Sequence, residues 1–258
     1  MKITLIGAGN LAVNLAHALC HTSHELVQIY SRTNESAQRL AHSLCVSEYT
    51  SSLDAVNHDS DLYIIAVADQ ALAQVADQLK QGREDCLFVH TAGTLPMDLL
   101  PMQRRGVFYP MQTFSRQRIV DFSHIPVFIE AADAHDQELL HQLAADLTDA
   151  VYQLDSANRR YLHLAAVFCC NFANHCMALG SHLLRKHGIP FSVMIPLIEE
   201  TARKIRTISP ELAQTGPAQR HDFNVIQRQI DLLQSDGEVH LRDIYEQLTQ
   251  SIILLNHD

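Results

Sequence analysis

Short apolar runs alternate with helix-like patterns along the first half of the chain. Runs at 3–6, 26–30 and 62–67 are mostly apolar and short, which is typical of strands in a buried parallel sheet. The segments that follow them repeat apolar residues every three to four positions, as amphipathic helices do. We therefore expect further strands at 86–89, 107–108, 127–129 and 151–152, and helices at 10–20, 35–44, 71–79 and 137–147. This alternation predicts a doubly wound, mostly parallel α/β sheet.

From residue 154 onward the pattern is helical only. A helix predicted to begin at Ser156 continues to about residue 187, where Gly188 and Pro190 supply stop signals. Further helices are expected at 192–208, 221–234 and 238–255, separated by Pro- and Gly-containing turns. The fold class predicted is α/β, with a doubly wound domain over residues 1–153 followed by an all-α domain over residues 154–258.

A glycine loop joins the first predicted strand to the first predicted helix. It reads Gly7-Ala8-Gly9-Asn10-Leu11-Ala12 and fits the pattern GxGxx(G/A). The first glycine permits a tight turn, the second lets a pyrophosphate approach the backbone, and the helix N-terminus faces the anion. We expect Gly7, Ala8, Gly9, Asn10 and Leu11 to contact a dinucleotide; a glycine turn without a ligand is the alternative.

The end of the second strand indicates which dinucleotide is bound. Sites for NAD usually place a carboxylate here to accept from the ribose hydroxyls, whereas this chain has Tyr30-Ser31-Arg32-Thr33. A hydroxyl followed by a guanidinium suits a 2′-phosphate, so Ser31 and Arg32 favour NADP(H). The alternative is that Arg32 is a solvated turn residue.

Two other strand ends should reach the same edge of the sheet. Val67 and Ala68 follow one strand, and His90 and Thr91 follow the next, with Gly93 allowing close approach. Ligands of open α/β sheets lie outside the carboxyl ends of the strands, so we expect these four residues to line the nicotinamide end of the cofactor site.

The helix expected after residue 153 carries a polar stripe. Residues 161–184 are apolar on almost every side, which predicts a central helix packed by its neighbours. The exceptions fall on one face, at His163, Asn171, Asn174, His175 and His182. A ligand cleft would satisfy these groups, and so would a wet or dimer-facing stripe or ordinary protein partners.

Charge and composition exclude several function classes. The formal charge is −10, and residues 1–153 carry 9 Lys and Arg against 18 Asp and Glu, which argues against binding nucleic acid. The six cysteines include no CxxC pair and lie in apolar or helical runs, which predicts reduced, buried residues of a cytoplasmic protein.

Membrane and metal sites are not expected either. No signal peptide is indicated, and the longest apolar run, 164–170, is too short to span a membrane. His17, Cys20, His21 and His24 have spacing that resembles metal ligands, but they fall at the sheet edge opposite the ligand crevice. We therefore expect no metal in the site.

Several motifs together resemble one bacterial family. Its members join an N-terminal Rossmann-like NADP-binding domain to a C-terminal helical domain of unknown function, are provisionally assigned as NADP oxidoreductases, and are similar to the pyrroline-5-carboxylate reductase and 6-phosphogluconate dehydrogenase superfamily. The resemblance spans nearly the whole chain and implies an NADP-dependent oxidoreductase. It is carried by 7–10, 30–32, 90–93, 109–114, 161–167 with Asn171, 196–201, and 215–217 with Arg220 and Asp222.

One departure from the superfamily bears on the chemistry. Its hydroxyacid dehydrogenases carry Lys-x-x-x-Asn on the buried helix, and here the lysine position is Val167 while Asn171 matches. His163 lies one turn earlier on the same stripe and titrates near neutral pH, so it is the best replacement for the proton donor. Hydroxyacid chemistry is therefore disfavoured.

These observations predict an oxidoreductase that transfers a hydride between nicotinamide and a small C=N or C=O substrate in the cleft between the domains. His163 would supply the proton, Asn171 would orient the substrate, and Gln112 and Arg220 would bind it. Pairing of Arg220 with Asp222 is an equally good reading of that residue. The alternative function is a non-catalytic NADP-binding sensor. A homodimer through the helical domain is expected, because an all-round apolar helix needs more cover than a small domain gives.

Overall fold

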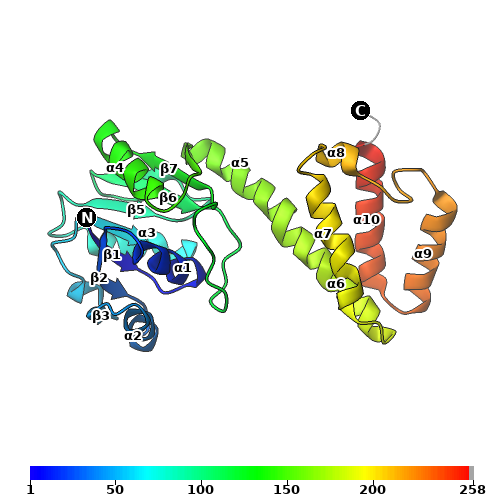
Figure 1. Cartoon of the computed structure of the whole chain (residues 1–258), viewed down its shortest axis with the longest axis horizontal. Helices are drawn as coiled ribbons and strands as arrows, with labels where there is room; N and C mark the ends of the chain where they lie inside the picture. Colours follow the sequence, from blue (N-terminus) through cyan, green and yellow to red (C-terminus); the bar gives the residue numbers. More distant parts are fainter. Residues whose placement is uncertain (256–258) are drawn as a thin grey trace. The chain divides into compact units, whose positions relative to one another are not determined.

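The computed structural model describes residues 1–255 and divides the chain into two compact units, Met1–Cys170 and Asn171–Asp258. Strands and helices alternate in the first unit, and only helices follow in the second (Figure 1). The fold class predicted from the apolar pattern is confirmed. The domain seam predicted between residues 153 and 154 coincides with the end of the last strand, and the two units part seventeen residues later.

The sheet of the first unit is mostly parallel. Within residues 1–255 it has eight strands in the order β3-β2-β1-β4-β5-β6-β7-β8. All neighbours pair in parallel except β6 and β7. Because β1 lies between β2 and β4, the chain reverses its direction of winding at β1. The strands are β1 (Lys2–Ile6), β2 (Glu25–Tyr30), β3 (Glu48–Thr50), β4 (Leu62–Ile65), β5 (Leu87–His90), β6 (Arg105–Pro110), β7 (Val127–Ala131) and β8 (Val151–Gln153).

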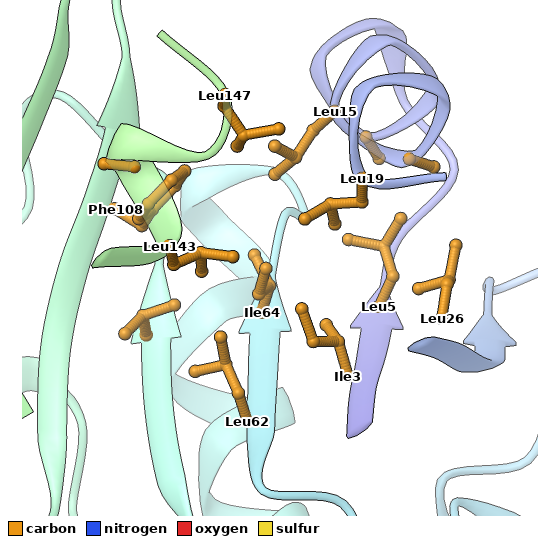
Figure 2. Packing of buried hydrophobic residues seen from close by; sticks show 14 of the residues in the cluster. Ile3, Leu5, Leu15, Leu19, Leu26, Leu62, Ile64, Phe108, Leu143 and Leu147 are labelled. Carbon is orange, nitrogen blue, oxygen red and sulfur yellow. The ribbon is translucent and has the colours of Figure 1, made fainter. Parts of the chain in front are cut away.

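Helices cover both faces of this sheet. On one face α1 (Asn10–Leu19) and α4 (Ala134–Ala145) pack on the strands, and Figure 2 shows Leu15, Leu19 and Leu143 among Leu5, Ile64 and Phe108. On the other face α3 (Asp69–Leu79) packs its Leu72, Ala76 and Leu79 against Tyr63, Ile65 and Phe88. Helix α2 (Asn34–Ser43) lies beside β2 and β3. Strand residues alternate between the two cores, which is why these runs are apolar at nearly every position.

A long helix begins after β8. It consists of α5 (Ser156–Ala166), a π-helical segment (Val167–Phe172) and α6 (Ala173–Lys186), and the boundary between the two units falls inside the π-helical segment. The prediction that its 161–184 segment is buried is wrong for the single chain, where Tyr161 is 70% and Phe168 62% exposed. By length and composition alone, Ser156–Lys186 would also suffice to cross a membrane, which is weak support for a span.

The second unit contains the remaining helices of the described chain. They are α7 (Ile195–Lys204), preceded by a 3₁₀ turn at Phe191–Met194, the short α8 (Pro210–Ala213), α9 (Phe223–Ser235) and α10 (Val239–Leu255). The helix predicted over 192–208 is therefore shorter, and Ser209 caps a new one by accepting from the Leu212 amide. Lys186 ties α6 to the turn before α10 through Glu238, at 2.7 Å.

The prediction that the cysteines are buried is also wrong. Of the six cysteines, all within the described residues, five are exposed and only Cys86 is partly buried. Cys169, Cys170 and Cys176 share the exposure of the long helix, and Cys20 and Cys45 lie where α1 and α2 end. Residues 1–255 contain no group of three or more potential metal ligands, and His24 pairs with Asp146 at 2.9 Å.

Candidate functional site

A pocket of about 650 Å³ opens where the sheet reverses its winding. Its walls come from the carboxyl ends of three adjacent strands: Gly7 to Gly9 after β1, Tyr30 to Thr33 after β2, and Ala66 to Ala68 after β4. Residues of α3, among them Ala71, Gln74 and Gln78, complete one side. Both the size and the position are those of a ligand site in an open α/β sheet.

The two loop glycines have different surroundings. Gly7 has φ +130°, and a Cβ there would lie 2.3 Å from the carbonyl oxygen of Ala66, so no other residue fits the turn. Gly9 has open space around the position of a Cβ, with no atom within 4 Å. It is the N-cap of α1 and makes no side-chain cap, so the first amides of that helix remain available. The loop therefore fits a pyrophosphate at the helix N-terminus.

The pocket is positively charged within an acidic unit. It is lined by Arg32 and Arg116 and, among the described residues, by no Asp or Glu. Five of the other Lys and Arg side chains in residues 1–153 pair with carboxylates, and Arg83 bonds backbone carbonyls. Within the described chain, Arg32, Arg83, Arg116 and Arg118 therefore lack a carboxylate partner, and two of these four line the pocket. An anionic ligand would supply the missing countercharge.

Most of the residues predicted to hold a cofactor line this pocket. They are Gly7, Ala8, Gly9, Ser31, Arg32, Val67 and Ala68. Asn10 and Leu11 begin α1 and have other contacts, since Asn10 Nδ2 donates to the Phe114 carbonyl at 3.2 Å and Leu11 packs on the core. Arg116 comes from the segment between β6 and β7 and was not predicted.

His90 ends β5 and Thr91 follows it, and neither residue lines the pocket. His90 is fully buried, and burial, followed by the nearby charge of Arg159, lowers its pKa to about 4. Its Nδ1 accepts from the Ala92 amide at 3.1 Å, and its Nε2 lies 3.3 Å from the Pro96 carbonyl. The ring is therefore neutral, and both of its nitrogens are engaged within the chain. The predicted contact between His90 and the cofactor would have to be made by the backbone of His90, and it stays a prediction.

His163 meets a tyrosine at the neighbouring strand end. The hydroxyl of Tyr109, on β6, lies 2.9 Å from Nδ1 of His163, and Tyr109 is buried. A Cβ on Gly93 would lie 2.4 Å from the same Nδ1, so Gly93 leaves the space that the imidazole fills. Burial raises the pKa of the Tyr109 hydroxyl, which the charge of Arg159 partly opposes. The Tyr109–His163 pair thus lies beside the carboxyl ends of β5 and β6.

A buried ion pair fixes the start of α5. Arg159 is fully buried, and its Nη1 donates to Glu130 of β7 at 2.6 Å while Nη2 donates to the Leu95 carbonyl at 2.6 Å. Ser156 donates to the same carboxylate at 2.6 Å and accepts from the Met97 amide. Because His163 follows Arg159 by one turn, this network sets where the imidazole lies. The spacing 156, 159, 163 is the sequence signal that could have revealed it.

The other predicted substrate residues are Gln112, Asn171 and Arg220. Gln112 is exposed and accepts from the Thr113 amide at 2.9 Å. Asn171, in the π-helical segment, and Arg220 belong to the second unit. The alternative reading of Arg220, a pairing with Asp222, is not formed within residues 1–255; Asp222 caps α9 by accepting from the Val225 amide at 3.2 Å.

Two domain families match the chain. Residues 2–93 match the family described as NADP oxidoreductase coenzyme F420-dependent, and residues 125–252 match the domain of unknown function DUF2520. Among curated proteins, none matches significantly.

Solved structures extend the comparison to the whole chain. The imine reductase of Myxococcus stipitatus, in complex with NADP+, has a TM-score of 0.68 at 16% identity, covering 98% of this chain and 92% of its own. A 1-pyrroline-5-carboxylate reductase from Streptococcus pyogenes has a TM-score of 0.63 at 17% identity, covering 100% and 99%. At these identities the two structures show a shared fold.

One relative is much closer in sequence. The Bacteroides fragilis protein BF3122, described as a putative NADP oxidoreductase, is 49% identical over 98% of this chain and 97% of its own, with a TM-score of 0.92. The resemblance inferred from the motifs is thereby confirmed. This chain belongs to the family of NADP oxidoreductases that join a Rossmann-like domain to a DUF2520 domain.

Proposed function

We propose that this protein is an NADPH-dependent reductase that transfers a hydride between the nicotinamide of NADP(H) and a small substrate with a C=N or C=O bond. The observation that carries the proposal is the pocket after β1, β2 and β4, which combines the Gly7–Gly9 loop with two arginines that lack carboxylate partners. The named activity of BF3122 supports the same reaction class.

The preference for NADP(H) over NAD(H) rests on the end of β2. Ser31 and Arg32 line the pocket where an acidic residue would accept from ribose hydroxyls, and the Arg32 guanidinium has no ion pair within the described chain. A 2′-phosphate offers that guanidinium a charge-assisted partner. The description of the matching domain also names coenzyme F420, so the activity test below includes it as a second hydride partner.

The dinucleotide, when bound, supplies the hydride chemistry, and the chain supplies positioning and a proton. The glycine loop and Arg32 would hold the phosphates. In its protonated form His163 would donate from Nδ1 to the Tyr109 oxygen and deliver the Nε2 proton to the substrate, which leaves the imidazole neutral. Burial raises the pKa of the Tyr109 hydroxyl, so this neutral group would orient the imidazole without giving up its own proton.

Substrate contacts are proposed from the sequence pattern. Asn171 would orient the substrate, Arg220 would hold a carboxylate, and Gln112 would line the site, which would form between the two units. The side chain of Arg220 makes no hydrogen bond or ion pair with the described residues, which is compatible with a carboxylate ligand.

We also propose a cytoplasmic homodimer formed through the helical domain. Large apolar side chains are exposed on the second unit of the single chain, including Leu197 at 59%, Leu212 at 78% and Leu232 at 61%. Exposed apolar surface of this kind is typical of protein interfaces. A second copy of the chain would cover this apolar surface, so no lipid bilayer is needed to cover it. Light scattering should then give twice the chain mass of 29.0 kDa. The net charge of −10 continues to disfavour nucleic acid as a partner.

The reductase proposal is tested by following NADPH oxidation with a panel of small cyclic imines and 2-oxo acids, and with F420. His163→Asn should lower kcat by about a hundredfold or more with NADPH affinity unchanged, because the proton donor is lost. Tyr109→Phe should lower kcat less and shift its pH profile. His175→Asn, on the exposed part of the same helix, is the matched control and should keep full activity.

Two results would contradict this assignment. Tight NADPH binding without turnover of any substrate would favour the non-catalytic sensor. Equal activities of His163→Asn and His175→Asn would remove His163 from the mechanism.

A further inference from the structure

We propose that Arg116 is a second phosphate-binding arginine of the cofactor site, delivered to the glycine loop by the segment between β6 and β7. This inference rests on the proposed dinucleotide and adds a residue that no motif identifies. Residues 111–126, here named the strap, leave β6, which is separated from β1 by β4 and β5. The strap nevertheless reaches the N-terminal half of α1.

Two asparagines of α1 hold the strap in place. Asn14 is fully buried; its Nδ2 donates to the Ser115 carbonyl at 3.0 Å and its Oδ1 accepts from the Val120 amide at 3.0 Å. Asn10 Nδ2 donates to the Phe114 carbonyl at 3.2 Å. The residues on both sides of Arg116 are therefore bonded directly to the helix whose N-terminus faces the pocket.

Apolar contacts anchor the same segment. The rings of Phe114 and Phe122 stack with centroids 5.8 Å apart, Phe122 and Ile125 are buried, and all three belong to the core beneath α1 or pack against it. A segment fixed by hydrogen bonds and by core contacts loses little further freedom when it binds a ligand. The strap is thus suited to present a charged side chain in a defined position.

Arg116 lies beside the proposed pyrophosphate position. Its Nη2 donates to the Ala8 carbonyl at 2.8 Å, and its side chain lines the pocket with Gly9 and Arg32. One of the five guanidinium N–H groups is used in this bond, and within residues 1–255 Arg116 makes no other hydrogen bond or ion pair. An unpaired guanidinium next to open space at Gly9 is the arrangement that binds phosphate oxygens.

Two groups of the dinucleotide carry phosphate oxygens that Arg116 could bind, the pyrophosphate and the 2′-phosphate. Titrations with NADPH and NADH distinguish them, using Arg116→Gln and the matched control Arg118→Gln. Arg118 is exposed on the same strap, has no carboxylate partner among the described residues, and does not line the pocket.

Arg116→Gln should weaken NADPH binding by about tenfold to a hundredfold, the effect of losing a hydrogen bond to a charged group. An equal loss for NADH assigns the pyrophosphate, and a loss confined to NADPH assigns the 2′-phosphate; both support the inference. An affinity for both nucleotides within twofold of wild type would overturn it, as would an equal loss in Arg118→Gln. If the wild-type protein binds neither nucleotide, the proposed function fails first.

A second measurement uses the unaltered protein and therefore does not depend on whether the variant folds. Phenylglyoxal modifies accessible guanidinium groups, and peptide mapping follows each site. Saturating NADPH should slow modification of Arg116 and leave the rate at Arg118 unchanged. Equal rates at Arg116 with and without NADPH would contradict a phosphate contact.

Discussion

The imidazole of His90 provides a pH-dependent test at the scale of one residue. Its pKa in the folded chain is about 4, chiefly because burial disfavours the charged form, against about 6.5 when unfolded. Between pH 4 and pH 6.5 the unfolded chain binds a proton at His90 more readily than the folded chain does. The free energy of unfolding therefore falls as pH drops from 6.5 to 4. The His90 contribution to this loss is about 3 kcal/mol at most.

Urea unfolding of wild type and His90→Asn across that pH window measures this contribution. The variant lacks the titrating ring, so its stability should decline less steeply than that of wild type. Parallel pH profiles for the two proteins would show that His90 does not titrate as its burial implies.

Individual residues differ in how far the sequence could identify them. Arg32 could be selected because it lies two residues after the end of β2, and His163 because it shares a helical face with other polar residues. Arg116 could not, because only the hydrogen bonds of a sixteen-residue connection bring it to the glycine loop. Tyr109 was noted only as part of a strand-end segment; its pairing with His163, 54 residues away, is a tertiary contact.

At the scale of elements, α1 positions both the glycine loop and the strap. Asn14→Ala removes hydrogen bonds to three backbone groups and leaves the Ser115 and Val120 groups unsatisfied. We expect unfolding to become easier by about 2–3 kcal/mol, measured in urea. NADPH binding should weaken as well, since Arg116 loses its support. Asn10→Ala, which loses only one such bond at an exposed site, should show a smaller change in stability.

An Asn14→Ala protein that is destabilised and yet binds NADPH with wild-type affinity would separate the strap from cofactor binding. The strap would then serve only to cover the core.

Helices and strands with a strong apolar pattern could be predicted from the sequence. Features that depend on contacts with neighbouring segments could not. The central strands appeared as apolar runs because both their faces are covered. The three-residue edge strand β3 gives no run and was missed. The long helix was recognised, but its burial was not, because apolar side chains on every side do not reveal whether the same chain or another covers them.

At the scale of the molecule, the charge of the pocket is opposite in sign to the net charge of the chain. The chain carries −10 overall, and residues 1–153 hold twice as many Asp and Glu as Lys and Arg. Yet the pocket is lined by Arg32 and Arg116, and by no acidic side chain among the described residues. The net charge disfavours a polyanion as a partner, while the local charge suits a small anionic ligand.

The proposed function depends above all on this pocket binding NADP(H) in preference to NAD(H). The most direct measurement is the dissociation constant of NADPH and of NADH for wild type and for the Ser31→Ala/Arg32→Ala double variant. We predict that wild type binds NADPH about tenfold or more tightly than NADH, because Arg32 meets the 2′-phosphate. The double variant should lose this preference by binding NADPH less well while NADH affinity stays constant. Equal affinities in wild type, or an unchanged preference in the variant, would contradict the account.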